Sequence, residues 1–212
     1  MDLLIRPDDA LIVIDPQLDF CPGGALAVAG GDEIMAPIAE LAERCPLVVI
    51  TQDWHSPDHA SFASSYPGRV PFDTFELAYG PQVLWPDHCV RSTPGAGFHP
   101  DLAPAVDRAA LILRKGTHRD IDSYSAFLEN DKVSATGLAG YLRDKGVRRC
   151  LFVGLAYDFC VAWSAQDAVR FGFEAAVLKP LTRAIAMPVA SGRTTVDDAE
   201  AAFRSAGIPV LA

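Results

Sequence analysis

The sequence contains no apolar run of the roughly 18 residues that a membrane-spanning helix needs. Its first residues lack a basic segment followed by a long apolar stretch, so no signal peptide is visible and we expect a cytoplasmic protein. The 27 acidic and 18 basic residues give a net charge of −9, and no basic stripe favours a nucleic-acid surface. We therefore expect neither a membrane nor a nucleic acid as a partner.

Motifs for nucleotide binding and for thiolate metal sites are also absent. The first apolar run leads into Asp15-Pro16-Gln17 rather than into a G-x-G-x-x-G turn, and there is no P-loop, which disfavours dinucleotide oxidoreductases and nucleotide hydrolases. The five cysteines are widely spaced, without a C-x-x-C pair, so they predict neither a disulfide framework nor a zinc–thiolate site. No linker or repeat divides the chain, and residues 1–212 are predicted to form a single domain.

Apolar runs and helical patterns alternate along the chain. The apolar runs predict strands at 10–14, 46–50, 110–113, 150–155, 174–178 and 208–211. Helices are predicted at 31–44 with Asp32 as cap, at 134–145 with Ser134 as cap, at 160–171, and at 196–206. This order predicts an α/β fold whose parallel sheet is covered on both faces. Region 54–107 is predicted to be irregular, and loops of that length are usually functional.

Reactive side chains follow four of the predicted strands: Asp15, Asp53, Lys115 and Cys160. Ligands of such sheets bind beyond the carboxyl ends of the strands. The helix after Cys160 and the cation of Lys115 are expected to favour its thiolate, and Asp15 could move the thiol proton. Taken singly, each residue is better explained as a buried structural thiol or a surface ion pair. The three together favour a nucleophilic site.

A second set consists of Asp53, His55 and His88. In extended backbone Asp53 and His55 face the same side, and carboxylate with imidazole suits zinc, iron or manganese. His88 could complete the set from the long region, and His59 is a further candidate. By spacing alone, loop histidines on the surface are at least as well supported. The other two histidines have no evident partner and are expected on the surface: His99 and His118.

Five segments, in order, carry a resemblance that covers nearly the whole chain: VIDPQLDFCPGGAL, TQDWHSPDHASF, LWPDHCV, LRKGTHRDIDSYSAF and GLAYDFCVAWSAQDA. They resemble the nicotinamidases, also called pyrazinamidases, of the isochorismatase-like hydrolase superfamily. The resemblance implies a three-layer α/β/α fold with a six-stranded, mainly parallel sheet. It also implies a metal-dependent hydrolysis of nicotinamide, and of pyrazinamide, to the acid and ammonia through a cysteine thioester, in NAD salvage.

The resemblance also assigns roles by position. It implies a catalytic triad of Asp15, Lys115 and Cys160, and metal ligands at Asp53, His55 and His88, with zinc expected and iron or manganese as alternatives. It implies an oxyanion hole from the backbone N–H groups of Ala156 and Cys160, after a cis peptide bond between Leu155 and Ala156. Further residues are expected to bind the substrate: Phe20, Trp85, Leu155 and Tyr157. His59 is expected to lie behind the metal ligands.

The metal is expected to hold the pyridine nitrogen, apart from the triad, rather than to activate the nucleophile. The segment before the nucleophile departs from many relatives at Tyr157 and Phe159, which could alter the pocket rim. A homo-oligomer is possible. Two alternatives stay open: a metal-free isochorismatase or carbamoyl amidohydrolase, which would not be expected to hold both metal-ligand segments, and a non-catalytic binding module, which the complete triad disfavours.

Overall fold

A six-stranded parallel sheet forms the centre of the molecule, in the computed structural model that describes residues 3–189 and 192–212. The strand order is β5-β2-β1-β6-β7-β8, and every neighbouring pair is parallel. The strands are β1 Asp9–Ile14, β2 Leu47–Asp53, β5 Leu111–Lys115, β6 Arg149–Leu155, β7 Glu174–Arg183 and β8 Val210–Leu211. The predicted α/β fold is confirmed.

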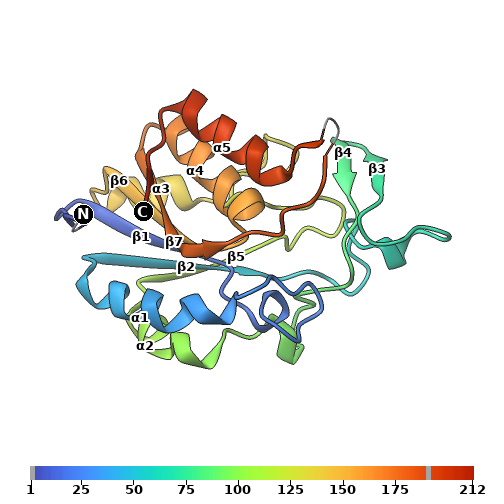
Figure 1. Cartoon of the computed structure of the whole chain (residues 1–212), viewed down its shortest axis with the longest axis horizontal. Coiled ribbons are helices and arrows are strands. Elements are labelled where there is room, and N and C mark those ends of the chain that lie inside the picture. Colours follow the sequence, from blue (N-terminus) through green and yellow to red (C-terminus); the bar gives the residue numbers. More distant parts are fainter. Residues whose placement is uncertain (1–2, 190–191) are drawn as a thin grey trace.

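Helices cover both faces of this sheet. Figure 1 shows α1 and α2 on one side and α3, α4 and α5 on the other. Their bounds are α1 Met35–Arg44, α2 Ala103–Arg108, α3 Leu138–Asp144, α4 Ala162–Arg170 and α5 Thr195–Ala206. Burial on both faces explains why β1 is apolar at nearly every position, since all six of its residues are buried. No helix among the described residues is long and apolar enough to cross a membrane.

The prediction for the last helix is confirmed. Thr194 is the N-cap of α5 and forms a capping box with Asp197, and Gly207 ends the helix with φ +68°. The box satisfies free N–H groups of the first turn, and glycine adopts the left-handed conformation without the steric cost of a side chain. Local sequence therefore determines both ends of this helix.

Two other helix predictions are wrong at their starts. The predicted helix 31–44 begins as a 3-10 turn, Asp32–Ile34, so Asp32 does not cap α1. The predicted helix 134–145 begins only at Leu138, because Gly137, with φ +93°, interrupts the chain before it. The Ser134 hydroxyl donates a hydrogen bond to Asp131 at 2.6 Å and caps no helix.

Region 54–107 is more ordered than predicted. It contains the antiparallel hairpin β3 Thr74–Leu77 and β4 Gly80–Val83, the helix α2, and short 3-10 turns. Gln82 anchors the hairpin, because its amide nitrogen donates to Asp122 Oδ2 and to the Tyr124 hydroxyl, each at 2.8 Å. These bonds fix the hairpin against the segment that follows β5.

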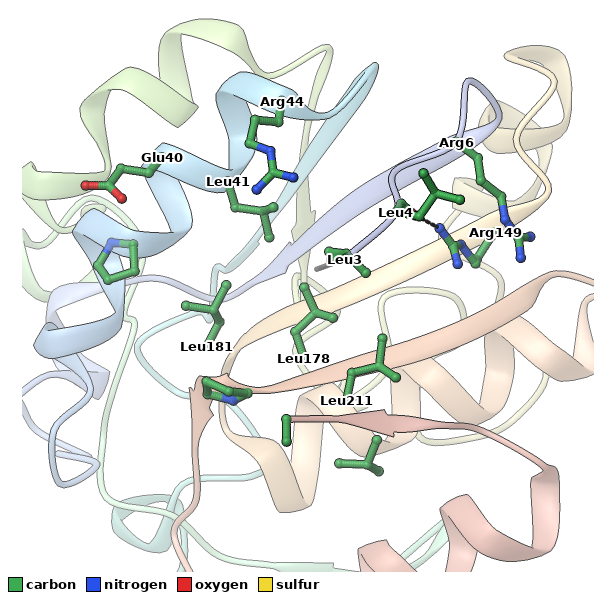
Figure 2. A pocket seen from close by; sticks show the side chains of 14 residues that line it. Leu3, Leu4, Arg6, Glu40, Leu41, Arg44, Arg149, Leu178, Leu181 and Leu211 are labelled. Carbon is green, nitrogen blue, oxygen red and sulfur yellow. Dashed lines mark hydrogen bonds between the residues drawn. The ribbon is translucent and has the colours of Figure 1, made fainter. Parts of the chain in front are cut away.

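An apolar groove of about 880 Å³ lies between α1 and the last two strands (Figure 2). Leu41 of α1, Leu178 of β7 and Leu211 of β8 line it, and Arg44 and Arg149 stand at its rim. Arg149 is the first residue of β6, whereas the reactive residues predicted from the sequence follow the strands at their carboxyl ends. The groove is therefore separate from the site described next.

Candidate active site

The carboxyl ends of four strands bring the predicted reactive residues together. Asp15 directly follows β1, and Asp53 and Lys115 are the last residues of β2 and β5, where they pair in register. Cys160 lies after β6, within a π-helical turn, Tyr157–Val161, that precedes α4. All four side chains are buried. The parallel sheet thus converts four positions that are distant in sequence into one cluster.

The ammonium group of Lys115 lies at the centre of this cluster. Its Nζ is 2.8 Å from Asp15 Oδ2 and 2.5 Å from Asp53 Oδ1. It also donates to the backbone carbonyl of Ser123 at 2.8 Å and lies 3.6 Å from Cys160 Sγ. Burial alone would lower the pKa of Lys115, but the two carboxylates outweigh it and hold that pKa well above its usual value. Lys115 is therefore a fixed positive charge.

Lys115 favours the thiolate of Cys160, as expected from the sequence, but burial acts more strongly in the opposite direction. Burial raises the pKa of this thiol well above the usual value, and the attraction of Lys115 does not overcome this effect. Cys160 lies within the π-helical turn that runs directly into α4, whereas the sequence predicts it as the first residue of that helix. A base is needed to take the thiol proton.

Asp15 is placed to be that base. Burial and the charge of Asp53 raise its pKa to about 6, against the opposing effects of Lys115 and Thr51, so it is largely ionised at pH 7. The Thr51 hydroxyl donates to Asp15 Oδ1 at 2.6 Å. A carboxylate oxygen of Asp15 lies within 4.8 Å of Cys160 Sγ. Oδ1 accepts the hydrogen bond from Thr51, whereas Oδ2 has the ion pair with Lys115 but no hydrogen-bond partner among the described residues, so a lone pair of Oδ2 can accept the thiol proton.

Replacing Lys115 with methionine is expected to destabilise the metal-free protein by about 3–5 kcal/mol, because it leaves the buried carboxylates of Asp15 and Asp53 without their shared cation. Urea unfolding monitored by circular dichroism measures this loss. Lys179→Met is the matched control, because Lys179 forms an exposed pair with Glu200. Equal, small losses for the two variants would contradict the structural role given to Lys115.

A group able to hold a metal ion adjoins this cluster. Ligand atoms of Asp53, His55 and His88 all lie within 4.8 Å of one another, and the three residues are buried. His55 Nδ1 is 2.9 Å from the carbonyl of Gly116, and His88 Nδ1 is 2.8 Å from the carbonyl of Pro86. Carbonyls only accept, so each Nδ1 carries the proton and each Nε2 presents its lone pair toward the group. These residues fit a divalent metal.

The protonation of His88 and the charge of Asp53 also favour a cation in this group. Burial and His55 lower the pKa of His88 to about 4, which keeps it neutral. Asp53 raises the pKa of His55 against the effect of burial. His55 Nε2 lies 3.6 Å from Asp53 Oδ2, so a bound metal would compete with a proton for this nitrogen.

The two predicted sets are not apart from each other. Asp53 contacts Lys115 through Oδ1, while its Oδ2 faces His55 and His88 at 3.6 and 4.0 Å. The expectation of separate metal and triad sites is thus wrong, because Asp53 and Lys115 are register partners on neighbouring strands. One carboxylate serves both groups.

His59 lies behind His55, with ring centroids 4.3 Å apart. Its Nε2 is 3.0 Å from the carbonyl of His118 and its Nδ1 is 2.8 Å from Ser61 Oγ, so both ring nitrogens have partners. His59 also belongs to a second potential group with His55 and Asp122. The His118 side chain is exposed as predicted, whereas His99 is partly buried and its Nδ1 accepts the N–H of Asp101.

A narrow cavity opens next to Cys160. Phe20 and Trp85 line it, as predicted, together with Phe159, which the sequence places near the pocket rim, and Tyr124, which it does not indicate. The rings of Trp85 and Phe159 meet edge to face, with centroids 5.0 Å apart. The cavity has about 20 Å³ of free volume, against roughly 300–1,000 Å³ for ordinary ligand pockets. The free space beside Cys160 is therefore small.

Two side chains predicted to bind substrate do not line this cavity. Tyr157 packs instead against Phe203 of α5, with ring centroids 5.5 Å apart, and Leu155 is fully buried at the end of β6. Ala156, Phe159 and Cys160 reach the cavity from this stretch. The cis peptide bond between Leu155 and Ala156 is confirmed. The oxyanion role of the Ala156 and Cys160 N–H groups stays a prediction.

Comparison with known proteins agrees with this geometry. Residues 9–188 match the isochorismatase domain family. A nicotinamidase from Acinetobacter baylyi is 53% identical over 178 residues, which cover 84% of this chain and 82% of that protein.

Solved structures show the same likeness. The nicotinamidase/pyrazinamidase of Acinetobacter baumanii superposes with a TM-score of 0.92 at 46% identity, covering 97% of this chain and 96% of that one. The L. infantum protein in complex with nicotinate has a TM-score of 0.82 at 35% identity, with coverage of 100% and 96%. A pyrazinamidase of Pyrococcus horikoshii in complex with zinc has a TM-score of 0.72 at 35% identity, with coverage of 97% and 99%.

These matches and the residue cluster define the class: the chain belongs to the isochorismatase domain family. Its relatives within that family are amide hydrolases, and the identity extends over most of the chain. The activity is that of a nicotinamidase.

Proposed function

We propose that this chain hydrolyses nicotinamide to nicotinate and ammonia through a thioester on Cys160. The observation that carries this proposal is the cluster of Asp15, Lys115 and Cys160 beside a cavity walled by aromatic side chains. A thiol, a buried base and a fixed cation are the groups that covalent amide hydrolysis needs. Aromatic walls suit a flat pyridine or pyrazine ring, so pyrazinamide is a second expected substrate.

In the first half of the reaction, Asp15 accepts the thiol proton as Cys160 Sγ attacks the amide carbonyl carbon. The carbonyl oxygen becomes an oxyanion, which the backbone N–H groups of Ala156 and Cys160 would stabilise; loss of one such donor typically costs about 3–4 kcal/mol. Collapse of the tetrahedral intermediate breaks the C–N bond. The proton on Asp15 passes to the leaving nitrogen, and ammonia departs.

In the second half, a water molecule attacks the thioester carbonyl while Asp15 accepts one of its protons. The C–S bond then breaks, and the product leaves as nicotinic acid, which loses its proton to water to become nicotinate. The proton returns from Asp15 to the sulfur, which restores the thiol and carboxylate of the resting enzyme. Lys115 keeps its proton throughout, orients Asp15, and stabilises the thiolate that forms 3.6 Å away.

We further propose that Asp53, His55 and His88 hold one divalent transition metal. The neighbour from Pyrococcus horikoshii, which contains zinc, supports zinc, while iron and manganese accept the same donor set. When bound, the metal would offer an electrophilic site for the ring nitrogen of the substrate. His88 also contacts the cavity wall, because its ring lies 5.4 Å from that of Phe20.

The wider setting of the enzyme rests on the resemblance. We propose that residues 1–212 form one domain, which is supported by the family match over residues 9–188 and by the inclusion of β1 and β8 in one sheet. A cytoplasmic location, a role in NAD salvage and a homo-oligomeric state stay predictions.

Ammonia release from nicotinamide by the purified protein tests the proposed function. Coupled detection with glutamate dehydrogenase should show turnover of nicotinamide and pyrazinamide. An N-carbamoyl amine, followed by the same ammonia assay, and isochorismate, whose hydrolysis releases pyruvate and is followed with lactate dehydrogenase, serve as control substrates for the rival activities and should give no product. Turnover of either control without turnover of nicotinamide would contradict the proposal.

Metal removal is expected to weaken nicotinamide hydrolysis far more than benzamide hydrolysis. His88→Ala should raise the KM for nicotinamide by about tenfold or more, and misplacement of the carbonyl should also lower kcat. Benzamide lacks the ring nitrogen, so its already slow hydrolysis should change less than about twofold. His88 is chosen rather than Asp53, because the Asp53 carboxylate also holds Lys115.

Alkylation of Cys160 by iodoacetamide provides the readout that does not depend on turnover. Its rate should stay within about threefold of the wild-type rate in His88→Ala, because the thiol contacts Lys115 rather than His88. Elemental analysis reports the metal content of each sample. If metal loss impaired both amides equally, or abolished alkylation, the metal would act on the nucleophile or the fold rather than on the substrate ring.

A further inference from the structure

The segment that follows β7 forms one wall of the catalytic cavity without regular secondary structure of its own. It spans residues 184–187, and Ile185 lines the cavity together with Phe159 and Cys160. Because the cavity has only about 20 Å³ of free volume, the position of this wall limits the room beside Cys160. Whatever holds the segment in place therefore affects how a substrate ring fits.

The carboxylate of Asp158 holds this wall. Asp158 precedes Cys160 by two residues in the same π-helical turn, and it is only 5% exposed. The N–H of Ile185 donates to Oδ1 at 3.0 Å, and the N–H of Ala186 donates to Oδ2 at 2.8 Å. Charge-assisted hydrogen bonds of this kind are stronger than neutral ones, and here they join the turn that carries the nucleophile to segment 184–187.

The backbone of segment 184–187 includes a residue in an unfavourable conformation that has to be stabilised by its surroundings. Ala186 has φ +58°, in the left-handed region that side chains other than glycine rarely adopt. Residues kept in that region persist only where their surroundings determine the conformation. The hydrogen bond from the Ala186 N–H to Asp158 supplies this constraint at the strained residue itself.

Thr195 completes the arrangement. Its hydroxyl donates to Asp158 Oδ2 at 2.5 Å and accepts the N–H of Met187 at 3.0 Å. We call this set the Asp158 clamp: the Asp158 carboxylate, the N–H groups of Ile185 and Ala186, and the Thr195 hydroxyl. Each carboxylate oxygen accepts at least one hydrogen bond, so the carboxylate is used for positioning rather than for proton transfer.

We propose that Asp158 is a positioning residue that fixes Ile185 against the cavity and thereby sets the fit of the substrate ring beside Cys160. The proposal rests on the proposed function for the identity of that ring. An amide cannot replace the carboxylate, because one end of asparagine carries N–H donors. If that end replaces Oδ1 it faces the Ile185 N–H, and if it replaces Oδ2 it faces the Ala186 N–H and the Thr195 hydroxyl.

A double-mutant cycle tests whether Asp158 acts through Ile185. In the wild-type background, Asp158→Asn is expected to lower kcat/KM for nicotinamide by about tenfold, mainly through KM, since the ring loses its fitted wall. In the Ile185→Ala background the same change should cost less than about twofold, because the side chain through which it acts is gone. Equal losses in the two backgrounds, or no loss in either, would overturn the proposal.

A second readout does not require nicotinamide to be the substrate. Alkylation of Cys160 is measured with iodoacetamide and with the bulkier N-phenylmaleimide, and mass spectrometry locates the adduct. If segment 184–187 is no longer held in place, the bulkier reagent can reach Cys160 more easily. Asp158→Asn should therefore raise the ratio of the N-phenylmaleimide rate to the iodoacetamide rate by about threefold or more. An unchanged ratio would contradict the proposal even if ammonia release failed, which keeps this inference distinct from the proposed function.

Asp197→Asn is the matched control. It makes the same change of carboxylate to amide at the start of α5, where Asp197 belongs to the capping box, and it touches none of residues 185–187. Both readouts should stay within about twofold of wild type in this variant. If Asp158→Asn does not fold, Thr195→Val removes one member of the clamp and should show smaller effects of the same sign, again absent in the Ile185→Ala background.

Discussion

Cys160→Ala is expected to lower the rate of ammonia release from nicotinamide on the order of 10⁴-fold or more, while the fold is retained. The nucleophile is the one group whose removal leaves no covalent route, and the remaining donors and the cavity still bind substrate. Steady-state ammonia release measures the loss, and circular dichroism checks the fold. Metal content should be unchanged, since Cys160 is not among the proposed ligands, Asp53, His55 and His88.

The other cysteines provide matched controls. Cys150 is fully buried in β6 and Cys45 is buried after α1, and burial raises the pKa of both thiols to about 12 and about 11. Cys150→Ala and Cys45→Ala should reduce stability by about 1 kcal/mol and leave kcat within about threefold of wild type. Substantial turnover by Cys160→Ala would remove the covalent mechanism.

Asp15→Asn is expected to slow acylation by about 100-fold or more, the usual contribution of a positioned acid–base group. The variant keeps the shape of the side chain and an oxygen that can accept from Thr51, but it cannot take the thiol proton. Because the pKa of Cys160 is raised, little thiolate forms without that base. Rapid mixing of excess enzyme with nicotinamide measures acylation in a single turnover.

Thr51→Val separates the proton transfer from the packing of Asp15. It removes the hydrogen bond to Oδ1 and leaves Oδ2, beside Lys115, free to accept the proton. Its acylation rate should fall by less than about tenfold. Near-normal acylation by Asp15→Asn would mean that Asp15 is structural and that another group is the base.

Much of the fold could be predicted because its signals are local. Buried parallel strands are continuous apolar runs, and the capping box with Gly207 marks both ends of α5. The sequence does not predict the hairpin β3–β4, since its strands are four residues long and mostly exposed or only partly buried, and β4 contains Pro81. Such strands carry too little apolar periodicity to be recognised.

The sequence predicts which reactive residues follow the strands. It does not predict which of these residues contact one another across neighbouring strands. Sequence order does not reveal that β5 pairs with β2, so the contact between Asp53 and Lys115 was missed. Depth of burial was equally hidden, and it is burial that keeps Cys160 protonated. Ile185 reaches the cavity through the Asp158 clamp, for which no local pattern exists.

Trapping the acyl-enzyme tests the central claim most directly. Wild-type protein is mixed with excess nicotinamide, quenched in acid within one turnover, and digested for peptide mass spectrometry under conditions that preserve thioesters. We predict that the peptide containing Cys160 gains the mass of one nicotinoyl group, and that the peptides containing the other cysteines do not: Cys21, Cys45, Cys89 and Cys150. The adduct should vanish in Cys160→Ala. A nicotinoyl group on a different cysteine that supports turnover would contradict the account.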